Sequence, residues 1–135
     1  QFRPSVWYYQ DKNQIQNKNG LTYELCAGIM DKGLDAKATI IEEIMEETGY
    51  SLNDVERVTS SFTALGFGAN CQVLFYAQID ESMKLGLGGG IDDEKIELVF
   101  IKRSEILDFI YDESKIKAPN LQFSILWWMI NKNPK

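Results

Sequence analysis

The sequence of 135 residues contains no histidine, and this absence narrows the chemistry available to the chain. Without an imidazole, neither a histidine-activated nucleophile nor a histidine-bound transition metal can be built. The two cysteines, Cys26 and Cys71, are too few for a disulfide scaffold, so we predict two free thiols in a reducing compartment. Cys26 is predicted to be a small buried thiol, because no histidine is present to activate it.

Other absences exclude further classes of protein. A net charge of −6 without a basic cluster argues against a nucleic-acid-binding surface. No apolar run reaches the ~18–20 residues of a membrane span, and no signal peptide is visible, so we expect a cytoplasmic protein without a membrane role. The chain is 44% apolar, which suits a single domain over 1–135. Because it begins with Gln, we expect an N-terminal portion to be missing.

Hydrophobic patterns and turn residues indicate the secondary structure. Residues 1–9 are predicted to end an edge strand, because Pro4 is followed by aromatic residues. Residues 11–20 are polar and predict a loop. The Gly-rich stretch within 83–93 also predicts a loop, since no Walker lysine follows it to indicate phosphate binding. We predict strands at 21–26, 55–65, 71–79 and 96–101, and helices at 104–111 and 119–131.

The most informative stretch is GIMDKGLDAKATIIEEIMEETGY, residues 28–50, whose second half predicts a helix between an Asp35 cap and a Gly49 stop. Its apolar residues share one side, and the opposite side carries Glu42, Glu43, Glu46 and Glu47. Each i,i+4 glutamate pair costs about 0.2–0.5 kcal/mol. No Lys or Arg occurs between Lys37 and Arg57 to relieve them. The face is therefore either solvated or bound to Mg²⁺, Mn²⁺ or Ca²⁺, which prefer carboxylate oxygens.

This stretch resembles the Nudix box, G-x5-E-x7-R-E-U-x-E-E-x-G-U, in which U is a bulky apolar residue. The matching residues are Gly28, Glu43, Ile44, Glu46, Glu47, Gly49 and Tyr50. Leu34 stands where the family has its first Glu, and Glu42 replaces an Arg that orients a neighbouring carboxylate. The resemblance implies an α/β fold, the Nudix α/β/α sandwich, with a mixed β-sheet flanked by helices. It also implies a metal-dependent hydrolase of phosphorus-containing acid anhydrides.

Three further segments resemble the nucleotide-sugar branch of the family. YELCAGIMDKG is similar to the E-L-P-A-G motif of ADP-ribose and nucleotide-sugar pyrophosphatases, with Cys26 in place of Pro. In those enzymes the carbonyl at the Ala27 position joins the metal shell. GGGIDDEKIELVFI resembles UDP-glucose and GDP-mannose pyrophosphatases and makes Glu94 the first candidate general base, ahead of Asp93 and Asp92. QFRP resembles a strand end whose arginine, here Arg3, reaches the substrate diphosphate.

The resemblance thus predicts hydrolysis of UDP-glucose to UMP and glucose 1-phosphate. Glu43, Glu47 and the Ala27 carbonyl would bind Mg²⁺, with Mn²⁺ as the alternative. Glu46 would assist directly or through water, and Glu94 would accept the proton. Relatives often dimerise, so a homodimer is expected, with a nucleotide sugar as the only other partner. ADP-ribose and GDP-mannose are alternative substrates. A non-catalytic Nudix sensor or interaction domain, or a structural domain whose helix binds no metal, are the competing classes.

Overall fold

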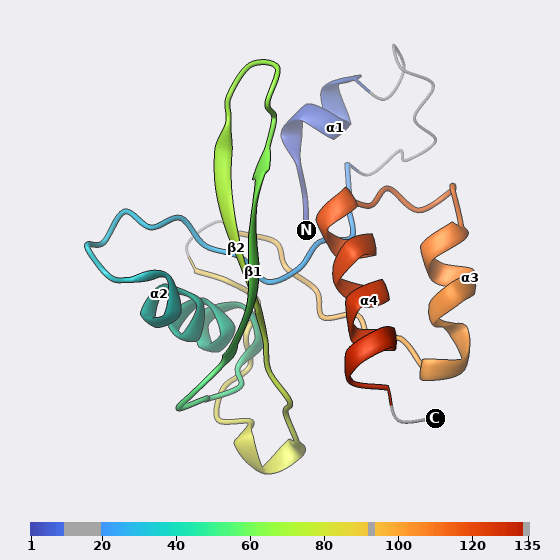
Figure 1. Cartoon of the computed structure of the whole chain (residues 1–135). Coiled ribbons are helices and arrows are strands. Elements are labelled where there is room, and N and C mark those ends of the chain that lie inside the picture. The colour runs from blue at the N-terminus through green and yellow to red at the C-terminus, as the bar shows by residue number, and fades with distance from the viewer. Residues whose placement is uncertain (10–19, 92–93, 134–135) are drawn as a thin grey trace. The chain divides into compact units, whose positions relative to one another are not determined.

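A computed structural model describes residues 1–9, 20–91 and 94–133 (Figure 1). The chain forms two compact units by its internal contacts. One unit combines Gln1–Leu25 with Asp92–Lys135, and the other spans Cys26–Ile91. Each unit is described separately below.

The unit Cys26–Ile91 contains the acidic helix predicted from the sequence. Asp35 caps helix α2, Ala36–Glu43, by accepting a hydrogen bond from the Ala38 N–H at 2.8 Å. The helix continues as a wider π-helical turn, η1, Ile44–Thr48, and ends at Gly49, whose φ is 76°. Both predicted boundaries, the Asp35 cap and the left-handed Gly49 stop, are therefore confirmed.

An antiparallel hairpin forms the sheet of this unit. Strands β1, Glu56–Thr63, and β2, Asn70–Tyr76, pair in register from Glu56 opposite Tyr76 to Thr63 opposite Asn70, with an irregularity between Arg57 and Thr59. These strands confirm the predictions at 55–65 and 71–79. Strand β1 is shorter than predicted at both ends, whereas β2 begins one residue earlier and ends three residues earlier than predicted. A short 3₁₀ turn, η2, Glu81–Met83, follows the hairpin. Tyr50 and Val55 are the buried apolar residues of this unit.

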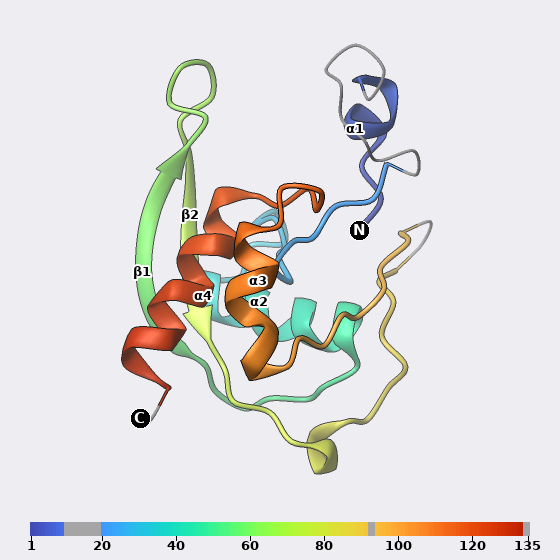
Figure 2. The same ribbon diagram turned by 90° about the vertical axis from the view of Figure 1, so that its right-hand side faces the viewer.

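Helices dominate the unit made of Gln1–Leu25 and Asp92–Lys135. It holds α1, Pro4–Tyr9; a 3₁₀ turn η3, Arg103–Glu105; α3, Ile106–Tyr111; and α4, Pro119–Asn131. Helices α3 and α4 lie side by side in both views (Figures 1 and 2). The Gln122 side chain of α4 donates to the Ile110 carbonyl of α3 at 3.0 Å. Buried Phe109, Ile110 and Leu121 form the core of this unit, and Tyr23 packs edge-on against Phe109 at 5.2 Å.

Three of the predicted strand segments do not form strands in the described chain. Residues 4–9 form helix α1 because Pro4 occupies its first turn, where a missing N–H costs nothing. Residues 96–101 alternate in hydrophobicity, yet no strand of the described chain pairs with them. A strand needs a neighbour for its backbone hydrogen bonds. The segment 21–26 forms only isolated bridges, Phe2 to Leu21 and Tyr23 to Lys117. The predicted loop at 11–20 lies almost entirely outside the described residues.

The described elements fit the predicted α/β class, since helices accompany a two-stranded antiparallel sheet. The predicted helix at 119–131 is confirmed, and the one at 104–111 begins with η3 and continues as α3. In the ranges the structure describes, every helix is too short or too polar to cross a bilayer. The mixed sheet and the sandwich remain predictions.

Candidate functional site

The acidic helix brings two of its glutamates against the segment that precedes it. The Glu47 side chain is only 6% exposed, so an entirely solvated acidic face is wrong for this residue. Gly28 lies so close to Glu43 that a Cβ on Gly28 would overlap the Glu43 carboxylate. Glycine is therefore the residue that gives the Glu43 side chain its place beside the chain at Ala27 and Gly28.

The Cys26 thiol also lies close to Glu47 and Glu43. Burial raises its pKa well above the ordinary thiol range, and a hydrogen bond from the thiol to Glu47 together with the negative charges of Glu47 and Glu43 raises it further. Both cysteines are free thiols, as predicted, and Cys26 is partly buried. A thiol with a raised pKa stays protonated at neutral pH, which agrees with a structural rather than a nucleophilic Cys26.

The predicted donors suit a hard divalent cation by their chemistry. Glu43 and Glu47 offer carboxylate oxygens, and Ala27, next to Gly28, offers a backbone carbonyl. Within residues 1–9, 20–91 and 94–133, no three His, Cys, Asp or Glu side chains are grouped to hold a metal by themselves. Two carboxylates and one carbonyl leave the other coordination positions to water and phosphate oxygens, which is how Mg²⁺ is usually bound.

A lysine from the loop before the helix neutralises part of the acidic face. The Lys32 ammonium lies 3.5 Å from a Glu42 carboxylate oxygen and 3.6 Å from one of Glu46. Glu46 first, and then Glu42, raise the pKa of Lys32. The prediction that no local cation relieves these glutamates is therefore wrong, because it considered only the helix and its C-terminal flank. The partner comes from the N-terminal side, within the motif itself.

The Gly-rich segment 86–90 closes the C-terminal end of the same helix. Gly89 N–H donates to the Glu47 carbonyl at 2.8 Å, and Gly90 N–H donates to the Glu46 carbonyl at 3.1 Å. A Cβ on Gly88 would lie 2.6 Å from the Glu47 carbonyl oxygen, so only glycine permits this approach. Gly89 and Gly90 thus bind backbone carbonyls of the helix end through their N–H groups.

The candidate general base and its alternatives are not in the unit that holds the acidic helix. Glu94 is exposed and belongs to the unit that includes Asp92–Lys135, four positions after Gly90 in the sequence. Asp92 and Asp93, the alternative bases, lie outside the described residues. The role of Glu94 therefore remains a prediction.

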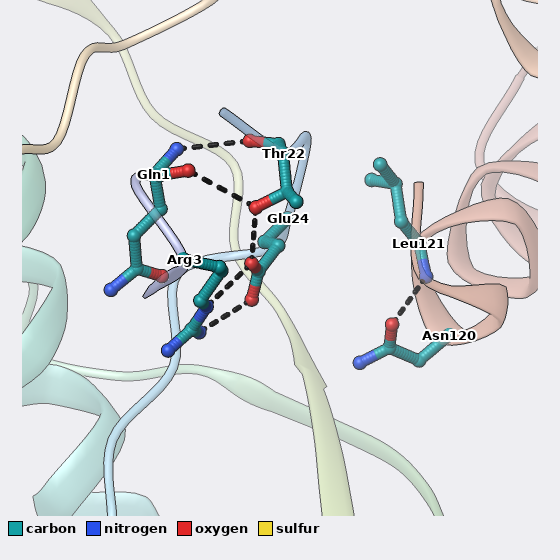
Figure 3. Close-up of polar contacts among 6 residues, drawn as sticks. All are labelled: Gln1, Arg3, Thr22, Glu24, Asn120 and Leu121. Carbon is teal, nitrogen blue, oxygen red and sulfur yellow. Dashed lines mark hydrogen bonds and ion pairs between the residues drawn. The ribbon is translucent and has the colours of Figure 1, made fainter. Parts of the chain in front are cut away.

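Arg3 is held by a carboxylate in the unit Gln1–Leu25 with Asp92–Lys135 (Figure 3). Its Nε and Nη2 donate to the two carboxylate oxygens of Glu24 at 2.7 and 2.6 Å. The Thr22 hydroxyl also donates to Glu24, at 2.5 Å. The hydrogen bond from Arg3 lowers the pKa of Glu24, so the pair is ionised at neutral pH.

Elsewhere in Figure 3, Asn120 accepts from the Leu121 N–H at 2.9 Å in the first turn of α4.

Comparison with known proteins identifies relatives over most of the chain, although no family model matches it. The uridine diphosphate glucose pyrophosphatase NUDT14 of Bos taurus is 35% identical over 95% of this chain and 68% of its own length. The GDP-mannose pyrophosphatase of Cronobacter sakazakii is 34% identical over 80% of this chain, and that of Klebsiella pneumoniae is 31% identical over 83%. The chain spans 53% of the length of each of these two bacterial relatives.

Proposed function

The chain belongs to the Nudix family of nucleotide-sugar pyrophosphatases, and from this premise we propose that it hydrolyses the diphosphate linkage of a nucleotide sugar. UDP-glucose is the first candidate, giving UMP and glucose 1-phosphate, since the cattle relative carries that name. GDP-mannose and ADP-ribose are the alternatives. The structural observation that supports this function best is the meeting of buried Glu47 and of Glu43 with the segment Cys26–Gly28.

Nudix pyrophosphatases use a divalent metal ion, and we propose Mg²⁺ here, with Mn²⁺ as the alternative. Carboxylate oxygens of Glu43 and Glu47 and the Ala27 carbonyl would hold it, with Glu46 assisting directly or through water. When bound, such an ion offsets charge on the diphosphate and makes water a stronger nucleophile. The ion pair with Lys32 limits where the Glu46 carboxylate can lie, so Glu46 is the less direct of the three glutamates.

Two further residues, Glu94 and Arg3, would take part in the proposed reaction. In the proposed reaction a water oxygen bonds to phosphorus, the P–O bond of the anhydride breaks, and a carboxylate oxygen of Glu94 accepts the water proton. A carboxylate can accept this proton because a bound divalent ion would already have activated the water. Arg3 would donate hydrogen bonds to a phosphate oxygen of the substrate, as a planar guanidinium suits phosphate geometry.

We also propose the sheet architecture, the cellular location and the oligomeric state that the family resemblance implies. The described helices and the antiparallel hairpin would belong to a Nudix α/β/α sandwich with a mixed sheet, formed as one domain by residues 1–135. The protein would act as a cytoplasmic homodimer with no nucleic-acid or membrane partner. Two free thiols suit a reducing compartment, and a net charge of −6 suits a protein that does not bind nucleic acid.

A panel of nucleotide sugars tests this function directly. Purified protein should release phosphatase-sensitive monoesters from UDP-glucose faster than from GDP-mannose or ADP-ribose, in Mg²⁺ and not in EDTA. The competing class is a non-catalytic Nudix sensor, which the Leu34 and Glu42 departures favour. Stabilisation by Mg²⁺ without turnover of any sugar would support that sensor and contradict the hydrolase. The absence of any metal effect would instead support a structural domain.

A further inference from the structure

The backbone around Arg3 is fixed by pairing with a second segment. Arg3 N–H donates to the Gly20 carbonyl at 2.8 Å, and Thr22 N–H donates to the Gln1 carbonyl at 2.9 Å. These bonds flank an antiparallel bridge between Phe2 and Leu21. Residues 1–3 and 20–22 are therefore held side by side, with Arg3 opposite Gly20. The Arg3 side chain reaches beyond this pairing to contact Glu24.

The contact between the two side chains has the geometry of a specific pair. Both Glu24 oxygens accept from one edge of the guanidinium, Nε and Nη2, in a bidentate arrangement. The Thr22 hydroxyl oxygen lies 2.5 Å from a Glu24 oxygen and 3.1 Å from the Gln1 carbonyl, and its proton, directed to the nearer acceptor, supports the Glu24 carboxylate. The Glu24 side chain is 23% exposed and that of Arg3 is 45% exposed, so the carboxylate is the more enclosed partner.

We propose that Glu24, held by Thr22, is a positioning residue that orients the Arg3 guanidinium for the substrate diphosphate. This inference rests on the proposed function, and it assigns to Glu24 a role beyond matching a motif. The bidentate contact with Glu24 uses two of the five guanidinium N–H donors of Arg3 and fixes the plane of the group. A guanidinium whose plane is already fixed loses less rotamer freedom when it binds a phosphate oxygen.

A simple charge argument predicts the opposite effect for Glu24. A carboxylate beside Arg3 places a negative charge near an anionic diphosphate and cancels the positive charge of the arginine. If charge alone mattered, removal of Glu24 would lower the KM for the substrate. If orientation matters more, removal of Glu24 would raise KM, even though it removes a repulsive charge. The sign of the change in KM therefore separates the two accounts.

The test is a double-mutant cycle on the nucleotide sugar that the panel shows to be hydrolysed, UDP-glucose in the first instance. Glu24→Ala and Arg3→Ala should each raise KM about tenfold, with kcat little changed, because both weaken binding of the same phosphate oxygen. In the Arg3→Ala background, Glu24→Ala should have no further effect on KM. Thr22→Val should raise KM by a smaller factor. Arg3→Lys should not restore the wild-type KM, since an ammonium cannot form the bidentate contact.

Glu105→Ala is the matched control for net charge, because it removes one carboxylate from the same unit and Glu105 pairs with Lys102 instead. This control should leave KM unchanged, and melting temperatures identify any variant whose fold is affected. A lower or unchanged KM for Glu24→Ala, or additive effects of the two alanine variants, would overturn the inference while the hydrolase stands. Absence of turnover by the wild-type protein on all three sugars would instead overturn the proposed function itself.

Discussion

At the scale of single residues, the candidate metal site depends on the absence of a side chain at Gly28. Gly28 has no Cβ, and the Glu43 side chain lies in the space that a Cβ would occupy. The backbone of Gly28 does not need a left-handed conformation, so this position requires glycine for space rather than for backbone freedom. The first glycine of the motif can therefore be explained by the carboxylate that it accommodates.

Gly28→Ala tests this explanation. The added methyl group should displace the flexible Glu43 side chain without unfolding the protein, so the melting temperature without metal should change little. Loss of the Glu43 position should weaken Mg²⁺ binding by about 10–100-fold, the usual effect of disturbing a ligand's support. A Mg²⁺ titration followed by melting temperature measures this. An unchanged Mg²⁺ dependence would show that the Glu43 position is irrelevant to the metal.

The sequence could identify Glu43, Glu47 and Gly28 because the spacing of a helix puts residues four apart on one face. It could not identify the ion pairs of Lys32 with Glu42 and Glu46. Lys32 lies in a loop, and the path of a loop cannot be predicted from the periodicity of its residues. The burial of Glu47 likewise cannot be predicted from a helical wheel. That wheel placed Glu47 opposite the apolar residues, but the 6% exposure of Glu47 depends on what packs over the helix end.

At the scale of elements, the acidic helix is fixed at both of its ends. Asp35 accepts from the Ala38 N–H at the first turn, and the segment 86–90 donates to carbonyls of the last turn. The carbonyls of Glu46 and Glu47 are thus bound by Gly90 and Gly89, so the end that carries two predicted functional carboxylates is held by its backbone. A rigid helix end is what precise placement of metal ligands requires.

Gly88→Ala and Gly33→Ala form a matched pair that measures this support. Both glycines have a positive φ, 69° and 75°, but a Cβ on Gly33 meets nothing within 4 Å. Gly33→Ala should therefore lower the free energy of unfolding by about 1–2 kcal/mol, from backbone strain alone. Gly88→Ala adds a collision with the Glu47 carbonyl and should cost about 3 kcal/mol or more.

Urea unfolding of the two variants measures both effects, and turnover measured under folding conditions should fall only in Gly88→Ala. Equal losses of stability in the two variants would mean that the close approach of the segment 86–90 contributes nothing. Equal turnover would mean that the segment does not support the carboxylates of Glu46 and Glu47.

Elements with local signals were predicted well, and elements that depend on distant partners were not. The cap at Asp35, the stop at Gly49 and the hairpin strands β1 and β2 all follow from nearby residues. The strand predicted at 96–101 needed a partner that periodicity cannot reveal. Residues 4–9 form helix α1 instead of the predicted strand end, because a proline suits the first turn of a helix as well as a strand edge.

At the scale of the whole molecule, the net charge of −6 repels an anionic nucleotide sugar at long range. Binding must therefore come from local positive charge, which the proposed function assigns to a divalent ion and to Arg3. The relatives agree with this chemistry, since the cattle and bacterial proteins are named as pyrophosphatases of nucleotide sugars. The central claim is that Glu47 and Glu43 hold the ion on which hydrolysis depends.

The most direct test compares Glu47→Gln with Glu42→Gln in Mg²⁺-dependent hydrolysis of UDP-glucose. Both changes remove one negative charge from the same helix, but Glu42 is exposed and pairs with Lys32, whereas Glu47 is buried. We predict that Glu47→Gln abolishes turnover and the stabilisation by Mg²⁺ while remaining folded, and that Glu42→Gln retains both. Wild-type turnover by Glu47→Gln would contradict the account.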